Sequence, residues 1–204
     1  VVGEAAAAQC GEGTGRQHGG GAVSKQGSIL YLDGITVSFD GFKALNSLSL
    51  IIGEGEMRAI IGPNGAGKTT LMRMLATAEE PTVGEIYING ERLLRDRSNA
   101  NLKRLLGYLP DDFPLYDDLT VWDYLDYFAR LYKLTAERRQ RRLYDVLELV
   151  QLSTKRNSKI ATLSRGMKQR LSLARTIIHE PILLLLDEPV SGLDPIARMQ
   201  FRQI

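Results

Sequence analysis

The sequence has little cysteine, little net charge and no long apolar run, and each shortage excludes a class of protein. The single cysteine, Cys10, excludes an internal disulfide and fits a reducing compartment. A net charge of +2 provides no strong field for nucleic acid, so we expect no nucleic-acid partner. The longest aliphatic run, Ile182–Leu186, is too short to cross a bilayer, and no secretory signal is visible. We therefore expect a soluble, globular protein whose membrane association, if any, goes through another protein.

Length and composition predict one ordered domain behind a low-complexity leader. The 204 residues are 44% hydrophobic, which is enough for a sizeable core. Residues 1–27 are rich in Gly, Ala, Gln and Ser without apolar periodicity, so this leader is expected to be disordered. The ordered domain is expected to cover residues 28–204.

The start of the ordered domain has the alternation of β-strands. Apolar residues alternate with smaller or polar ones over 29–39 and 45–52, and a third apolar run covers 57–61. Turns are predicted at Asp33-Gly34, Asp40-Gly41 and Gly53-Glu54-Gly55. The opening is therefore β-rich, with a strand at 57–61 leading into the next motif.

The motif at 62–70 reads GPNGAGKTT and lies between this predicted strand and the helical pattern that begins at Leu71. That context is typical of a phosphate-binding loop, whose glycines let backbone N–H groups turn toward an anion at a helix N-terminus. Lys68 is predicted to reach the β- and γ-phosphates, and the Thr69 hydroxyl to bind Mg²⁺. The predicted phosphate-binding residues are Gly62, Pro63, Asn64, Gly65, Ala66, Gly67, Lys68, Thr69 and Thr70.

The middle of the chain changes from strands to helices. Strands are predicted at 85–90, which ends in an Asn-Gly turn and joins the opening sheet, and at 106–109, before the acidic Asp111-Asp112. A capping box of Thr120 and Asp123 opens one helix, and a second helix starts at Thr135. Four arginines near its start, Arg138, Arg139, Arg141 and Arg142, are predicted to form a solvated face, with a partner-protein or anionic-lipid contact as the alternative.

Two adjacent carboxylates follow the apolar run 182–186. A strand this uniform is typical of the middle of a parallel sheet covered on both faces, and ligands bind at the carboxyl ends of such strands. Asp187 is therefore a candidate Mg²⁺ ligand, and Glu188 a candidate base that accepts a proton from the attacking water. The alternative is that the two acids merely cap the strand.

Ser164, followed by Gly166, is a good helix N-cap, and its position gives it a further meaning. The order of motifs resembles that of the ATP-binding cassette (ABC) ATPases over residues 29–204. In this order a phosphate loop is followed by a helical insert, by Ser-x-Gly at a helix start, by a strand ending in Asp187-Glu188, and by Ser191-Gly192-Leu193-Asp194. The resemblance implies an α/β P-loop NTPase fold: a mostly parallel sheet flanked by helices, an antiparallel β subdomain, and a helical subdomain at about 112–172.

The resemblance also implies roles in a head-to-tail dimer that binds and hydrolyses MgATP. Ser164 and Gly166 would contact the ATP of a second copy, and Asp194 would contact that copy directly. Phe39 would stack on adenine, with Phe42 as second choice, although both could equally be core aromatics. The implied partner beyond the second copy is a transmembrane permease, which places the subunit on the cytoplasmic face of the inner membrane.

The chain departs from the family pattern in three places. Asp111 stands where the family usually has Gln, so Asp111 is a candidate Mg²⁺ contact and coupling to the permease is expected to differ. Arg165 and Met167 replace Gly and Gln around the signature. The chain ends at Ile204, before the family's switch histidine, which predicts a truncated chain with weak or absent ATPase activity alone. His179 lies too early for that histidine and is expected to interact with a helix C-terminus.

Several functions fit these motifs to different degrees. The resemblance favours the ATP-binding subunit of a transporter with a separate permease, on the exporter side, because residues 107–125 and 163–175 look like exporter ATPases. Residues 37–46 instead resemble importers of urea or branched-chain amino acids. A soluble ABC ATPase of translation or repair, another phosphate-loop enzyme, and a nucleotide-binding fragment without catalysis are the alternatives.

Overall fold

A computed structural model describes residues 27–39, 42–93, 100–191 and 193–202. The chain falls into two compact units, residues 1–96 and 97–204. The predicted leader, apart from Gly27, and the predicted turn at Asp40-Gly41 lie outside the described residues. In the described ranges every helix is too short or too polar to cross a lipid bilayer.

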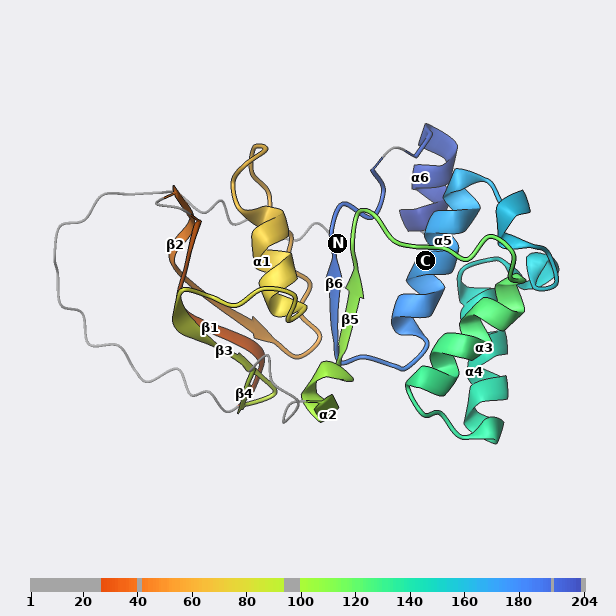
Figure 1. Ribbon diagram of the computed structural model, residues 1–204, viewed down its shortest axis with the longest axis horizontal. Helices are drawn as coiled ribbons and strands as arrows, with labels where there is room; N and C mark the ends of the chain where they lie inside the picture. The colour runs from red at the N-terminus through yellow and green to blue at the C-terminus, as the bar shows by residue number, and fades with distance from the viewer. Residues whose placement is uncertain (1–26, 40–41, 94–99, 192, 203–204) are drawn as a thin grey trace, which may run out of the picture. The chain divides into compact units, whose positions relative to one another are not determined.

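The first unit is built on an antiparallel sheet (Figure 1). Its strands are β1 (Ser28–Phe39), β2 (Phe42–Gly53), β3 (Val83–Ile88) and β4 (Glu91–Arg92), in the order β2-β1-β3-β4. Asn89 and Gly90 turn β3 into β4 with positive φ at both residues, as an Asn-Gly hairpin requires. The predicted strands at the start of the chain and at 85–90 are confirmed.

In the described part of this unit one helix, α1 (Lys68–Leu75), accompanies the sheet. Apolar side chains of β1, β3 and α1 are buried and form the core of the unit: Leu30, Leu32, Ile35, Val37, Ile86, Ile88, Leu71, Met74 and Leu75. The core therefore fixes α1, and with it the loop from which α1 starts.

Two predictions for the first unit are wrong. Asp33 and Gly34 do not make a turn: they lie inside β1, where the pairing with β2 and β3 shifts register. Gly34 has a φ of 57°, which permits this irregularity, and its N–H donates to Ser49 Oγ at 3.1 Å.

The segment 57–61 is not a strand, because no described strand pairs with it. Met57 and Ile61 are 96% and 81% exposed. An apolar run becomes a strand only where a neighbour accepts and donates its backbone hydrogen bonds.

The second unit places a two-stranded parallel sheet next to helices (Figure 1). Strands β5 (Leu106–Leu109) and β6 (Leu183–Leu186) pair residue for residue. The helices are α2 (Ala100–Lys103), α3 (Val121–Leu131), α4 (Ala136–Leu149), α5 (Arg165–Ile177) and α6 (Pro195–Arg202), with 3₁₀ turns at Ser153–Lys155 and Ile160–Thr162. One core joins α3, α4, α5, α6 and Leu109 of β5.

Strand β6 is less enclosed than its sequence predicts. Leu183 and Leu185 are buried, whereas Leu184 is 41% exposed, so burial alternates along the strand. The uniformly apolar sequence of β6 therefore does not mean that both faces of the strand are buried in this unit.

The helix starts were predicted correctly. Thr120 Oγ1 accepts a hydrogen bond from the N–H of Asp123 at 3.1 Å, and Ser164 Oγ accepts one from Met167 at 3.3 Å. Thr135 is the N-cap of α4, although its side chain makes no capping bond. These caps satisfy donors that the first helical turn leaves open.

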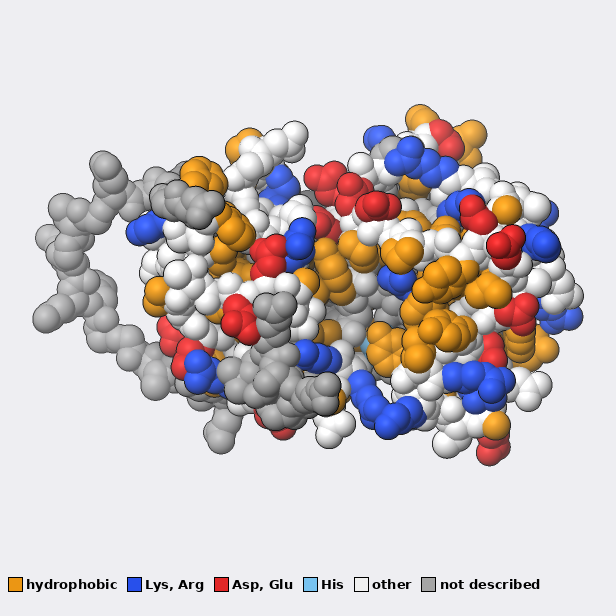
Figure 2. Space-filling view, viewed as in Figure 1, with side chains coloured by type: hydrophobic (Ala, Val, Ile, Leu, Met, Phe, Trp, Pro, Cys, Tyr) orange, Lys and Arg blue, Asp and Glu red, His pale blue; other side chains and the backbone are white. Residues whose placement is uncertain are grey.

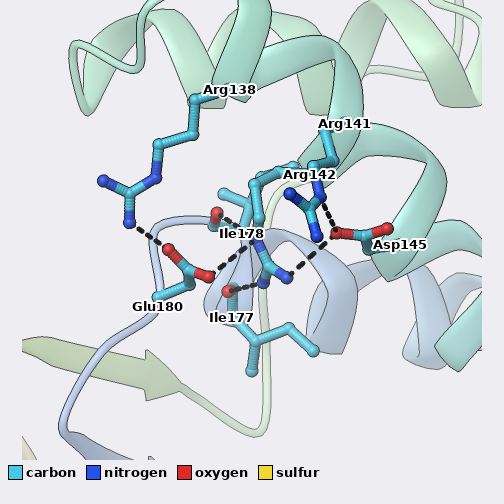
Figure 3. A network of polar contacts seen from close by, with 7 residues as sticks. All are labelled: Arg138, Arg141, Arg142, Asp145, Ile177, Ile178 and Glu180. Atoms are coloured by element: carbon cyan, nitrogen blue, oxygen red, sulfur yellow. Dashed lines mark hydrogen bonds and ion pairs between the residues drawn. The ribbon is translucent and has the colours of Figure 1, made fainter.

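The prediction that the four arginines of α4 form a solvated face holds for Arg138 and Arg141, which are exposed, but not for Arg139 and Arg142, whose side chains are each 19% exposed. Figure 3 shows the contacts of Arg138, Arg141 and Arg142. Arg138 pairs with Glu180, and Arg139 pairs with Asp126 of α3 at 2.7 Å. Arg142 donates to the carbonyl oxygens of Ile177 and Ile178, which closes the C-terminal end of α5. Glu180, Asp126 and the two carbonyl groups are distant in sequence from the arginines that bind them, so the run of arginines alone could not predict these contacts.

Candidate functional site

The loop at 62–67 has the backbone shape that the glycine pattern predicted. Gly65 and Gly67 both have a φ of 81°, in the left-handed region where L side chains are disfavoured. The N–H of Ala66 donates to the carbonyl of Pro63 at 3.2 Å, and that of Leu71 to Gly67 at 2.9 Å. The loop therefore turns tightly and runs directly into the first turn of α1.

Gly67 is held against β2. A Cβ on Gly67 would lie 2.5 Å from the carbonyl oxygen of Ala44 and 2.8 Å from the side chain of Leu45. Gly62 has no positive φ, but a Cβ there would lie 3.1 Å from Ala66. Close approach, as well as conformation, thus requires glycine, and the sequence reading missed the part played by Ala44 and Leu45.

Lys68 lies folded over its own loop. Its Nζ donates to the carbonyl oxygens of Gly62 at 2.7 Å and Pro63 at 2.9 Å. These bonds hold the ammonium group beside the loop, at the N-terminus of α1, where partial positive charge accumulates. The loop, the ammonium and the helix end together present donors and positive charge of the kind that binds an anion.

In the second unit the structure brings Asp111, Asp187 and Glu188 to one edge of a sheet. β5 and β6 are parallel and end together at Leu109 and Leu186, and the N–H of Asp187 donates to Leu109 at 2.9 Å. Asp187 is 5% exposed, whereas Glu188 and Asp111 are exposed. Glu188 has a φ of 46°, so the chain bends sharply at the residue expected to act as base.

The residues proposed for Mg²⁺ have the donor chemistry that this ion needs. In the described residues no group of three or more His, Cys, Asp or Glu side chains forms a metal site. Mg²⁺ usually takes only one or two protein oxygens, with phosphates and waters completing its shell. The Thr69 hydroxyl and the buried Asp187 carboxylate fit that requirement, and the ion would neutralise phosphate charge when bound.

Ser164 stands at an open helix end. It is exposed, as is Arg165, and its hydroxyl caps α5 through Met167. A Cβ on Gly166 would approach Ala197 of α6 to 3.0 Å, so α6 is packed close to this turn. The N-terminus of α5 is thus free to face an anion from outside the unit.

Asp194 has a local role that the sequence reading did not foresee. Its Oδ1 accepts a hydrogen bond from the N–H of Ala197 at 2.9 Å, which makes it the N-cap of α6. Since the residue is exposed, the carboxylate also remains open to a neighbouring molecule.

The two aromatic candidates for adenine stacking are both exposed. Phe39 ends β1 and is 48% exposed, and Phe42 begins β2 and is 66% exposed. Neither is a core aromatic, so the alternative that both fill the core is wrong.

His179 is partly buried in the second unit. Its Nε2 bonds the carbonyl oxygen of Leu106 at 2.9 Å, and its ring stacks on Tyr132 with centroids 3.7 Å apart. Burial lowers the pKa of His179 below its usual 6.5, so the ring is neutral at neutral pH. It follows the end of α5, as expected, but its contacts are with Leu106 of β5 and with Tyr132, the residue that follows α3.

Comparison with known proteins gives one consistent result. The family model described as "ABC transporter" matches residues 45–191, which is most of the chain. A solved structure described as the ATP-binding subunit of an ABC transporter superposes with a TM-score of 0.73 at 32% identity, covering 85% of this chain and 71% of that one.

Two of the curated relatives have names that mention multidrug transport or export. The probable multidrug ABC transporter ATP-binding protein YbhF of Escherichia coli is 39% identical over 179 residues, or 87% of this chain and 31% of YbhF. The Nod factor export ATP-binding protein I of Rhizobium johnstonii is 38% identical over 168 residues, covering 82% of this chain and 53% of the relative. The chain spans about half the length, or less, of the curated relatives it matches.

Proposed function

Since the chain belongs to the ABC transporter ATP-binding family, we propose that it binds and hydrolyses MgATP to drive a substrate through a separate membrane permease. The predicted α/β P-loop fold is confirmed by the solved ABC ATPases that this chain matches. Family membership implies ATP binding and, in general, ATP hydrolysis. The transport coupling, the partners and the residue roles below are our proposal.

The observation that carries the proposal is the phosphate loop. Gly67 lies against β2 at a distance that excludes a side chain, and Lys68 lies over the loop carbonyls at the start of α1. Lys68 would exchange these carbonyls for the β- and γ-phosphates, because a charge-assisted contact to phosphate is the stronger one. The loop N–H groups would bind the same phosphates.

Hydrolysis is assigned to the second unit. Asp187 would contribute an oxygen to the Mg²⁺ shell, and Asp111 is a further candidate contact in this unit. Thr69 is the candidate Mg²⁺ ligand of the first unit. Glu188, exposed at the carboxyl edge of β6, would accept the proton of the attacking water. Phe39 would stack on adenine, with Phe42 as second choice.

We further propose that two copies close head to tail, each covering the nucleotide of the other. The exposed Ser164 turn supports this arrangement, because a hydroxyl at an open helix N-terminus is an anion site that faces outward. Ser164 and Gly166 would meet the γ-phosphate of the second copy, and Asp194 would contact that copy.

The proposed direction of transport is export. YbhF carries a probable multidrug assignment and the Rhizobium relative exports Nod factor, and both align with more than four fifths of this chain. The permease would hold the subunit on the cytoplasmic face of the inner membrane. Copurification of the subunit with a polytopic membrane protein would test both the partner and the location.

The direct test of the phosphate loop is Lys68→Ala. The substitution removes a charge-assisted contact worth about 1.5 to 3 kcal/mol, so MgATP should bind about tenfold more weakly or worse. Affinity is measured by titration with a fluorescent ATP analogue.

Arg92→Ala is the matched control for Lys68→Ala. Arg92 is in the same unit but lies on β4, opposite Tyr87 of β3, and Tyr87 lies opposite Tyr31 of β1. The loop glycine Gly67 instead contacts Ala44 and Leu45 of β2. Its exposed ion pair with Glu85 contributes little to stability. Equal affinities for wild type, Lys68→Ala and Arg92→Ala would reject the loop assignment.

A further inference from the structure

A second candidate anion site lies in the second unit, away from the carboxyl edge of β5 and β6. A cavity of about 180 Å³ is lined by Arg104, Tyr132–Thr135, Arg138 and His179. We call it the basic pocket. It sits where α3 runs into α4, and Figure 2 shows basic side chains over this end of the unit. No Asp or Glu is among the lining residues.

The basic pocket has an excess of positive charge. In the described part of the chain, Arg104 and Lys133 form no ion pair, and both side chains are exposed. Arg138 pairs with Glu180, but Glu180 also pairs with Arg142 at 3.6 Å, so one carboxylate serves two guanidinium groups (Figure 3). Among the described residues, no carboxylate lies within ion-pair distance of Arg104 or Lys133.

The backbone adds donors at the same place. Thr135 is the N-cap of the fourteen-residue helix α4, and its hydroxyl makes no capping bond. The open N–H groups of the first turn of α4 and the helix dipole both favour an anion there, although Glu137 of that turn opposes it in part.

One wall of the basic pocket is flat and uncharged. The rings of Tyr132 and His179 stack within 4° of parallel, and His179 Nε2 is already bonded to Leu106. The recess is therefore preformed, because its wall is fixed by packing before any ligand arrives.

We propose that the basic pocket binds a phosphate group, with Arg104, Lys133 and Arg138 as its charged ligands and Thr135 with the start of α4 as neutral donors. Guanidinium groups match the geometry of phosphate oxygens, and a preformed cationic recess costs little to organise. The volume is below the 300 to 1,000 Å³ typical of sites for drug-sized ligands, so a phosphate group fits and a whole nucleotide does not. The inference does not depend on the proposed transport function.

The test is made in the Lys68→Ala chain, so that phosphate bound at the loop 62–67 does not contribute. Inorganic phosphate is titrated at low ionic strength while backbone amide resonances are followed by NMR. We expect saturable shifts at residues 133–136, and phosphate binding about tenfold weaker after Lys133→Met or Arg104→Met. Both residues are exposed, so the fold should survive either change.

Lys155→Met is the matched control. Lys155 is an exposed lysine of the same unit outside the basic pocket. It should leave phosphate affinity within about twofold, since a remote exposed charge is screened by salt. An equal loss in all three variants, unchanged affinity in Lys133→Met and Arg104→Met, or no shift at 133–136 would each overturn the proposal.

Two further probes identify the source of the phosphate group. Glycerol 3-phosphate represents a soluble phosphate monoester, and phosphatidylcholine vesicles with and without phosphatidic acid present a lipid headgroup. Lys133-dependent binding of only the soluble ester assigns the site to a metabolite. Lys133-dependent binding of the phosphatidic acid vesicles assigns it to a headgroup.

Discussion

Gly67 is the residue at which conformation and packing act together. Alanine there would carry a left-handed backbone, at about 1 to 2 kcal/mol, and would also meet the backbone of Ala44 at 2.5 Å. Such overpacking typically costs a further 1 to 3 kcal/mol. We expect Gly67→Ala to weaken MgATP binding at least about tenfold and to lower the free energy of unfolding, measured by nucleotide titration and urea denaturation.

Gly90→Ala is the control that carries the left-handed strain without the packing clash. Gly90 has a φ of 80°, nearly equal to that of Gly67, but a Cβ there would meet nothing within 4 Å. It should cost only the left-handed strain and leave nucleotide affinity unchanged. Equal nucleotide affinities in the two alanine variants would contradict the role given to the contact with β2.

The partly buried His179 predicts a pH dependence of stability. Because burial lowers its pKa in the folded chain below 6.5, the unfolded chain takes up a proton first as the pH falls. The free energy of unfolding should therefore fall as the pH drops below about 6.5, until the folded pKa is passed.

His179→Phe provides the measurement for that slope. Phenylalanine keeps the stack on Tyr132 but cannot titrate, so the difference between wild type and variant isolates His179 from the carboxylates. Urea unfolding at pH 7.5 and pH 5.5 should show a smaller loss of stability in the variant. An identical loss in both proteins would mean that His179 does not contribute.

Single residues differed in how well the sequence predicted them. The tight turn at 62–67 and the helix start at Lys68 were predictable because the pattern is local: the glycines, Lys68 and Thr69 lie within one turn and one helix start. Arg142 was not, because the carbonyls that it binds are 35 and 36 residues away. Gly67 was predicted for its conformation, while its contact with Ala44 needed the structure.

At the scale of elements, three helices end in the same left-handed turn, although none of them has the glycine that usually favours it. The helices α1, α3 and α4 close with paired bonds of the Schellman type, for example Ala78 N–H to Arg73 and Thr77 N–H to Met74. The residue after each cap has a positive φ and is not glycine: Thr77 at 63°, Lys133 at 60° and Gln151 at 57°. Helix ends were therefore harder to predict from sequence than helix starts, where Thr120, Thr135 and Ser164 gave the expected caps.

Thr77→Gly should stabilise the chain. Relief of the left-handed strain, about 1 to 2 kcal/mol, exceeds the roughly 0.5 to 1 kcal/mol that glycine loses through its greater freedom when unfolded. The expected gain in the free energy of unfolding is about 0.5 to 1 kcal/mol by urea denaturation. Thr77→Ala keeps the strain and should give no comparable gain; a gain of equal size in the alanine variant would locate the effect in the threonine side chain.

Strands were predictable where their partners are close in sequence. The hairpins β1–β2 and β3–β4 followed from alternation and an Asn-Gly turn, because turn and register are local. The segment 57–61 has strand composition but no described strand beside it, so composition alone misled.

At the scale of the whole molecule, the proposed chemistry is divided between the two units. The phosphate loop belongs to residues 1–96, whereas Asp187, Glu188 and Ser164 belong to residues 97–204. The α/β fold class was predictable, because the motif order is a property of the linear sequence. The role that we propose for Ser164 involves a second copy, and a single folded chain does not contain that copy.

Mixing two defective chains tests whether Ser164 acts on the nucleotide of its neighbour. In a head-to-tail dimer each site takes Lys68 from one copy and Ser164 from the other. A heterodimer of Lys68→Ala with Ser164→Asp would then contain one doubly defective site and one intact site, while both homodimers contain only damaged sites. Aspartate keeps the cap of α5 but repels phosphate, so the fold of the second chain should remain intact.

The measurement uses Glu188→Gln in both chains, so that bound MgATP is not consumed. Heterodimers isolated by two affinity tags should retain about one MgATP each, and the two homodimers almost none. If Ser164 instead acted on the loop of its own chain, every site in the heterodimer would carry one defect, and mixing would recover nothing. Nucleotide retention after gel filtration therefore distinguishes a site shared between copies from one completed within a single chain.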